Sequence, residues 1–122
     1  MLATERLLEI RGQFATVIQR LVPVELDGET LRLILYLEDG TNLRVTEQWP
    51  GETLRRYSYY WLTAADDLKI GWDNAPHHTQ LENFPHHKHV GHQGRLYPSH
   101  ETCLEEVMAM ILAGKDESAE RS

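Results

Sequence analysis

LRLILYLEDG, residues 31–40, decides the fold of this 122-residue chain. Leu31 to Glu38 is rich in residues that favour extended structure, and Asp39-Gly40 is a dipeptide typical of a tight turn between antiparallel strands. Residues 41–49 continue with alternating character after the turn. The pattern predicts a β-hairpin.

Two more strand-like segments follow the hairpin. Residues 53–63 (TLRRYSYYWLT) carry the aromatic enrichment that strands favour, and a short further segment follows a turn at residues 64–67. We therefore expect a meander of about four antiparallel strands, formed by residues 31–38, 41–49, 53–63 and 68–72.

Helical periodicity is found on either side of these segments. Apolar residues recur at spacings near 3.6 from Ala3 to Leu21, and Pro23 ends the predicted helix. A second helix is expected to begin near Leu104, with an N-cap within residues 99–101 and an end at Gly114.

The predicted fold class is α+β, with an N-terminal helix, an antiparallel sheet of about four strands, a histidine-rich loop and a C-terminal helix. A chain of this length buries one core, so residues 1–114 are expected to form a single domain and residues 115–122 a polar tail. Helices gathered on one face of the sheet would leave the other face free for a site. Alternation along the third strand would line that face with Arg56, Ser58 and Tyr60, or with Arg55, Tyr57, Tyr59 and Trp61.

Composition bounds the class of protein. No apolar run approaches the length that spans a bilayer, and the single cysteine, Cys103, cannot form an internal disulfide, so we expect a cytoplasmic protein without membrane contact. The net charge of −7 argues against nucleic-acid binding by the whole surface. Residues 101–122 hold six acidic and two basic side chains, however, whereas residues 84–100 contain no Asp or Glu. A local cationic patch is therefore expected.

Five of the seven histidines fall within residues 74–89, NAPHHTQLENFPHHKH. No helical period crosses residues 74–100, and three of the five prolines lie there. We interpret this segment as ordered but irregular, with a short extended piece at residues 87–90.

Three kinds of chemistry suit the histidines. Neutral imidazoles could hold a transition metal, with Asp73 as a carboxylate ligand, although the spacing matches neither the HExxH pattern nor a zinc finger. Alternatively, one histidine could remove a proton and another donate one, while Lys88 or an arginine stabilises negative charge, which suits RNA cleavage. The third reading makes them hydrogen-bonding spacers in a loop fixed by prolines.

Two motifs resemble a known family. Arg56-Tyr57-Ser58-Tyr59 is followed by the stretch 72–78 (WDNAPHH) and the stretch 84–89 (FPHHKH), and together with the helix that begins at Leu104 they resemble the TumE toxins of prokaryotic toxin–antitoxin modules. The likeness covers roughly residues 30–112. It implies a small toxin and a separately encoded antitoxin that carries a helix-turn-helix.

We therefore expect a toxin that acts as a metal-independent endoribonuclease, without a cofactor. Its expected partners are RNA and the cognate antitoxin, together with a second copy of the chain in a homodimer. The alternatives are a non-catalytic module whose histidines hold a metal and a toxin that blocks a protein target. The expected acid–base residues are His86, His87 and His89, supported by His77 and His78. The expected substrate contacts are Lys88, Arg56, Tyr57, Tyr59 and Asp73.

Overall fold

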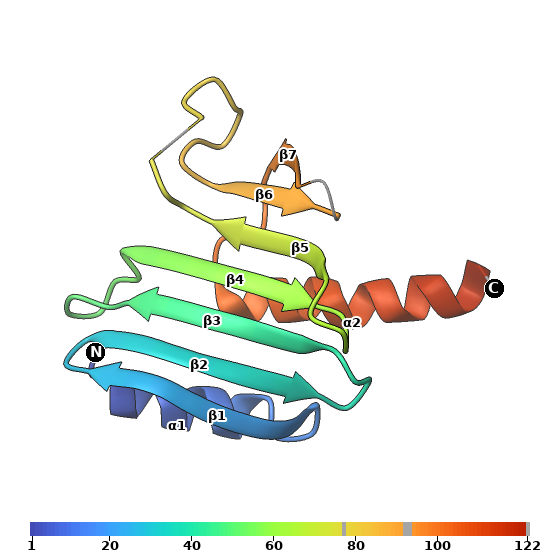
Figure 1. Cartoon of the computed structure of the whole chain (residues 1–122). Coiled ribbons are helices and arrows are strands. Elements are labelled where there is room, and N and C mark those ends of the chain that lie inside the picture. Colours follow the sequence, from blue (N-terminus) through green and yellow to red (C-terminus); the bar gives the residue numbers. More distant parts are fainter. Residues whose placement is uncertain (77, 92–93, 122) are drawn as a thin grey trace.

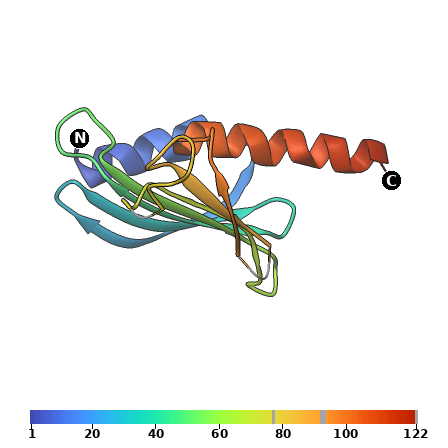
Figure 2. The same ribbon diagram turned by 90° about the horizontal axis from the view of Figure 1, so that it is seen from above.

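The structure is a computed structural model that describes residues 1–76, 78–91 and 94–121, with the side chains of residues 115–121 left out. Within these residues, seven strands form one antiparallel sheet in chain order, and two helices lie on one of its faces (Figures 1 and 2). The elements are α1 (Ala3–Gln13), β1 (Ile18–Asp27), β2 (Thr30–Leu37), β3 (Asn42–Gln48), β4 (Arg56–Leu62), β5 (Leu68–Asp73), β6 (His87–Val90), β7 (Arg95–Pro98) and α2 (Leu104–Arg121).

The hairpin predicted from residues 31–49 is present as β2 and β3, with Leu35 opposite Leu43. Its turn is stabilised by Asp39, whose Oδ1 accepts hydrogen bonds from the backbone N–H of Thr41 at 2.9 Å and from its hydroxyl at 2.6 Å. Gly40 adopts a φ of 90°, which glycine reaches without steric cost. The local turn chemistry therefore sets the register of the central strands.

The prediction of about four strands is wrong, because the protein is mostly sheet. The first helix ends at Gln13, and residues 18–27, part of which was expected to be helical, form β1 instead. The spacing of the apolar residues in this segment fits both the helical period of about 3.6 residues and the strand period of 2. Pairing with β2 selects the extended form. Pro23 is tolerated because β1 is an edge strand with a register shift between Pro23 and Glu25.

The other two additional strands lie within residues 74–100, where the extended piece expected at residues 87–90 is confirmed as β6 and β7 was not predicted. Residues 87–90 and 95–98 form the hairpin of β6 and β7, which completes the sheet beside β5. The last helix also differs from expectation, since it continues past Gly114 to Arg121. A glycine costs a helix interior only about 1 kcal/mol, and no proline follows it to force an end.

Alternation along the strands gives the sheet a covered face and an open face. Leu31, Leu33 and Leu35 are at most 1% exposed and belong to the same core as the α2 residues Val107 and Ile111. The side chains between them in sequence point to the opposite face, which neither helix covers (Figure 2). No helix in the described residues is long and apolar enough to cross a membrane.

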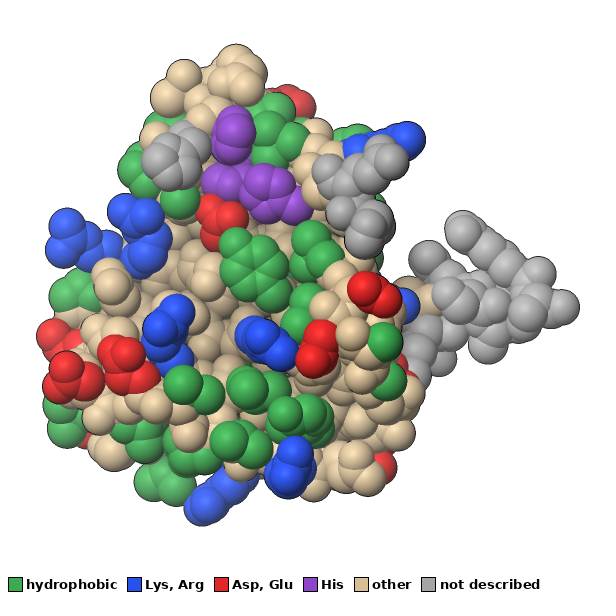
Figure 3. Space-filling model, viewed as in Figure 1, with side chains coloured by type: hydrophobic (Ala, Val, Ile, Leu, Met, Phe, Trp, Pro, Cys, Tyr) green, Lys and Arg blue, Asp and Glu red, His purple; other side chains and the backbone are tan. Residues whose placement is uncertain are grey.

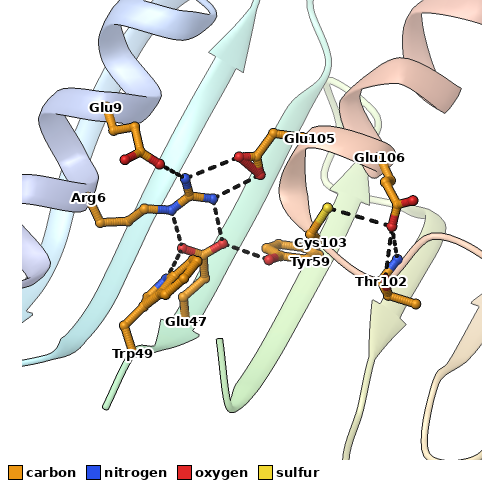
Figure 4. A network of polar contacts seen from close by, with 9 residues as sticks. All are labelled: Arg6, Glu9, Glu47, Trp49, Tyr59, Thr102, Cys103, Glu105 and Glu106. Carbon is orange, nitrogen blue, oxygen red and sulfur yellow. Dashed lines mark hydrogen bonds and ion pairs between the residues drawn. The ribbon is translucent and has the colours of Figure 1, made fainter. Parts of the chain in front are cut away.

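A buried ionic network ties the helices to the covered face (Figure 4). Arg6 of α1 is 1% exposed and forms ion pairs with Glu47 of β3 at 2.7 Å and with Glu105 of α2 at 3.0 Å. Burial alone would lower the pKa of Arg6, but the hydrogen bonds to the two carboxylates outweigh it and raise the pKa further. Tyr59 and Trp49 also donate hydrogen bonds to Glu47, at 2.6 and 2.8 Å. Three elements far apart in sequence thus share one charge centre.

Candidate functional site

The candidate site lies on the open face, where β5 and β6 run side by side. In their register Asp73 is opposite His87 and Gly71 is opposite His89. Residues paired across an antiparallel ladder point to the same face, as do residues two apart on one strand. Asp73, His87 and His89 therefore converge on one side of the sheet.

Asp73 is the centre of this cluster. Its Oδ1 lies 2.9 Å from Nε2 of His87, and its Oδ2 lies 3.7 Å from Nε2 of His89. The backbone N–H of Ala75 donates a hydrogen bond to Oδ1 at 3.0 Å, which fixes the carboxylate. Asp73 is 8% exposed and His87 is 3% exposed, whereas the His89 side chain is 29% exposed. The three ligand atoms lie within 4.8 Å of one another, so this group could hold a metal ion.

The side chain of Asn74 extends the sheet beyond the last residue of β5. Its Oδ1 accepts the backbone N–H of Tyr57 at 2.9 Å, and its Nδ2 donates to the Arg55 carbonyl at 3.0 Å. These two bonds act as a further pairing between the ends of β4 and β5. The backbone on both sides of Asp73 is therefore held in place.

His87 is held by partners on both ring nitrogens. Its Nδ1 lies 3.0 Å from the Pro85 carbonyl oxygen. A carbonyl can only accept, so Nδ1 carries a hydrogen and donates it. The other nitrogen, Nε2, faces the Asp73 carboxylate. The His87 ring is therefore held on both sides.

His78 brings a third imidazole to the cluster. The centroid of its ring lies 5.2 Å from that of His87 and 6.4 Å from that of His89, and the His87 and His89 rings are 5.2 Å apart. All three pairs meet edge to face, with interplanar angles of 74–86°. His78 itself is exposed, with a φ of 60°.

These histidines border a cleft of about 480 Å³ on the open face. Figure 3 shows histidine side chains gathered there beside a carboxylate, with Lys and Arg side chains on the same face. Gly71 shapes the cleft, because a Cβ at this position would lie 2.5 Å from Cδ1 of Tyr60. The absent side chain lets the Tyr60 ring lie across β5. The cleft is lined by Thr46, Arg56, Tyr57, Ser58, Tyr60, Asp73, Ala75, His78, His87 and His89.

A family model for toxin TumE matches residues 8–114, most of the chain. The chain belongs to the TumE family. It is therefore the toxin component of a toxin–antitoxin system, and family membership implies a cognate antitoxin as a partner. Neither the curated proteins nor the solved structures gave a match.

Two of the side chains predicted from the sequence lie on the covered face of this TumE toxin. His86 precedes β6, and its Nδ1 is hydrogen-bonded to the Tyr57 hydroxyl at 2.8 Å. Burial lowers the pKa of His86, and the negative charge of nearby Glu106 partly offsets this decrease. Lys88 lies opposite Trp72 in the ladder and forms an ion pair of 3.4 Å with Glu101. The structure thus separates both residues from His87 and His89.

The predicted substrate contacts divide in the same way. Arg56 is exposed and borders the cleft, as Asp73 does. Tyr57 is 2% exposed and stacks on Tyr59, which is fully buried and donates its hydroxyl to Glu47. Neither of these rings is accessible for stacking on a base. His77 lies outside the described residues.

Two cationic residues of the earlier strands, Arg32 of β2 and Arg44 of β3, were not identified from the sequence. Arg32, Thr46 and Ser58 occupy successive positions in one row across the sheet that ends at Asp73 and His87. Arg32, Arg44 and Thr46 also line a second depression of about 280 Å³, and Thr46 borders the main cleft as well. The alternation of residues 31–48 marks both arginines as facing away from the core, but their alignment with the histidines depends on the register.

Proposed function

We propose that this TumE-family toxin is a metal-independent endoribonuclease that cleaves RNA by histidine acid–base chemistry in the open-face cleft. The observation that carries the proposal is a pair of imidazoles, the exposed His78 and the partly exposed His89, beside the buried carboxylate of Asp73 and the guanidinium of Arg56. A base, an acid, an orienting carboxylate and a cation are the groups that this reaction uses.

The reaction moves two protons. The 2′-hydroxyl loses a proton to one imidazole as its oxygen attacks phosphorus, and the P–O5′ bond breaks while a protonated imidazole gives a proton to the departing 5′-oxygen. The products are a 2′,3′-cyclic phosphate and a 5′-hydroxyl. His78 and His89, whose ring centroids are 6.4 Å apart, take these two roles from either side of the phosphate.

Asp73 and His87 act as positioning residues. Both ring nitrogens of His87 already face acceptors, the Pro85 carbonyl and Asp73 Oδ1, so it has no hydrogen to spare for substrate. Asp73 Oδ2 faces His89 at 3.7 Å, a distance that can shorten when substrate closes the site. The carboxylate then orients the His89 ring.

The arginines of the open face supply the RNA path. Arg56 borders the cleft and contacts the scissile phosphate. Arg32 lies three strands from Asp73 in the same row, which corresponds to about 14 Å at roughly 4.8 Å per strand. Arg32 and Arg44 therefore contact phosphates further along the strand, and the half-exposed Tyr60 offers a ring for base stacking. These arginines would give an acidic protein a local cationic surface for RNA.

Incubation of the full-length toxin with total RNA, with and without EDTA, tests the proposal. We expect cleavage in both conditions and products that end in 2′,3′-cyclic phosphate. His78→Ala and His89→Ala should each lower the rate about 100-fold or more, the usual contribution of a general acid or base. His100→Ala is the matched control, because His100 contacts Asn83 rather than the cluster. Growth arrest in cells without any RNA cleavage by the purified toxin would refute the proposal.

A further inference from the structure

We infer that Asp73, His87, His89 and His78 also form a binding site for one divalent transition-metal ion of the zinc type. We further infer that an ion bound there switches the toxin off, which rests on the proposed nuclease function. Binding itself does not depend on that function. Asp73, His87 and His89 come from the paired strands β5 and β6, and His78 comes from the loop between them.

The carboxylate contacts have the spacing of a coordination shell. Zinc binds nitrogen and oxygen ligands at about 2.0–2.2 Å, so two ligand atoms of a tetrahedral ion are about 3.4 Å apart. The distance from Asp73 Oδ1 to His87 Nε2 is 2.9 Å and that from Asp73 Oδ2 to His89 Nε2 is 3.7 Å, so each carboxylate oxygen lies close to this spacing from one of the two imidazoles. The largest separation within the trio is below 4.8 Å, and a small rotation of the partly exposed His89 ring closes it.

The imidazole rings fit the same ion. The centroid of a ligating ring lies about 3.2 Å from the metal, so two rings on a tetrahedral ion are about 5.2 Å apart. The centroids of His87 and His89, and those of His78 and His87, are 5.2 Å apart, and the third pair is at 6.4 Å. Edge-to-face angles of 74–86° keep the rings from stacking, so their nitrogens can point inward.

The tautomer of His87 is the one that a metal ligand needs. Its Nδ1 hydrogen is donated to the Pro85 carbonyl, so Nε2 is the nitrogen directed at Asp73. A backbone carbonyl on the outer nitrogen is the usual arrangement around metal-bound histidines. A lone pair on Nε2 that faces a carboxylate at 2.9 Å requires a positive charge between them, which a proton or a metal ion provides.

The lysine that lies among the ligands in the sequence does not oppose a cation. Lys88, which stands between two of the ligands in the sequence, points to the covered face and is paired with Glu101. The donor set of three imidazoles and one carboxylate favours zinc and its neighbours over Mg²⁺ or Ca²⁺, which prefer oxygen ligands. Because the cleft leaves the site open on one side, the ion can enter and leave.

A bound metal ion would block the imidazole nitrogens that the proposed cleavage uses. An imidazole that coordinates an ion through Nε2 can neither take nor give a proton there. His78 and His89 are the proposed base and acid, so one bound ion blocks both. The toxin would then be active when it is free of metal and inactive when it is loaded.

The test is zinc binding by full-length toxin purified without a metal-affinity step. We expect one equivalent of Zn²⁺ by elemental analysis and by calorimetric titration, with no binding of Mg²⁺. Asp73→Asn and His89→Ala should each weaken Zn²⁺ binding at least tenfold, and His100→Ala should leave it unchanged. Circular dichroism checks that each variant is folded. Wild-type protein that takes up less than half an equivalent, or folded variants that bind as tightly as wild type, would overturn the site.

RNA cleavage is measured separately, so the two ideas can fail independently. With the site intact, equimolar Zn²⁺ should lower the cleavage rate at least tenfold, and EDTA should restore it. Zinc binding by a protein that cleaves no RNA under any condition would leave the metal site standing and refute the nuclease. Unchanged cleavage by protein loaded with one equivalent of Zn²⁺ would refute the switch.

Discussion

Substitution of Arg6 by methionine should destabilise this protein more than any change on its open face. Methionine keeps much of the side-chain volume but removes the cation that, among the described residues, pairs with Glu47, which is 0% exposed. The hydroxyl of Tyr59 and the indole of Trp49 still donate hydrogen bonds, but neither carries charge. Removal of one partner from a buried ion pair costs about 3–5 kcal/mol. That is a large part of the stability of a domain of this size.

The reciprocal substitution, Glu47→Gln, should lower the free energy of unfolding by less than Arg6→Met does. In Glu47→Gln, Arg6 keeps its ion pairs with Glu105 and Glu9, whose side chains are 35% and 47% exposed and therefore reach solvent. We expect a loss of about 2 kcal/mol, the value of a hydrogen bond to a charged group. The double variant Arg6→Met/Glu47→Gln should lose less than the sum of the two, because it no longer buries an unpaired charge.

Urea unfolding followed by circular dichroism gives these free energies. Arg11→Met is the matched control, since Arg11 lies on the same helix and is exposed. It should change the free energy of unfolding by less than about 0.5 kcal/mol. A loss below about 1 kcal/mol in Arg6→Met, or strict additivity in the double variant, would show that the network contributes little to the fold.

Three further outcomes are expected. Gly71→Ala should lower RNA cleavage, because the new Cβ would displace the Tyr60 ring. In urea unfolding, Gly71→Ala should lower the free energy of unfolding less in a Tyr60→Ala background than in the wild type. Arg32→Gln and Arg44→Gln should each weaken RNA binding and reduce the slope of log affinity against log salt by about 0.7, whereas an unchanged slope would place RNA elsewhere. His86→Phe should leave the cleavage rate within about threefold of wild type but cost about 1 kcal/mol of stability by urea unfolding, since a hydroxyl on the covered face loses its partner.

The parts of the fold that were predictable from the sequence depend on local chemistry. The turn at Asp39-Gly40 and the aromatic segment that became β4 both carry their own signals, and so does the beginning of α2 near Leu104. The family was also recognisable, because the motifs of residues 72–78 and 84–89 are specific. These features need no knowledge of distant contacts.

The parts that were not predictable depend on partners far along the chain. Val17 to Leu21 fits a helix or a strand equally well, and only β2 decides between them. The extended piece at residues 87–90 was expected, but its pairing with β5 was not, and that pairing determines which face each histidine occupies. His86 and His87 are neighbours in sequence and lie on opposite sides of the sheet. An interpretation that gives this segment no pairing in the sheet cannot place His86 and His87 on different faces.

The strict chain order of the sheet also bears on how the toxin is made. Each strand pairs with the one synthesised just before it, so the sheet can grow as the chain leaves the ribosome. Asp73 emerges well before His87 and His89, and α2, which covers the core, comes last. We expect nascent chains that end before β6 to carry a partial sheet without a working site. The proposed site needs β5 and β6 side by side, so it can form only after β6 has left the ribosome.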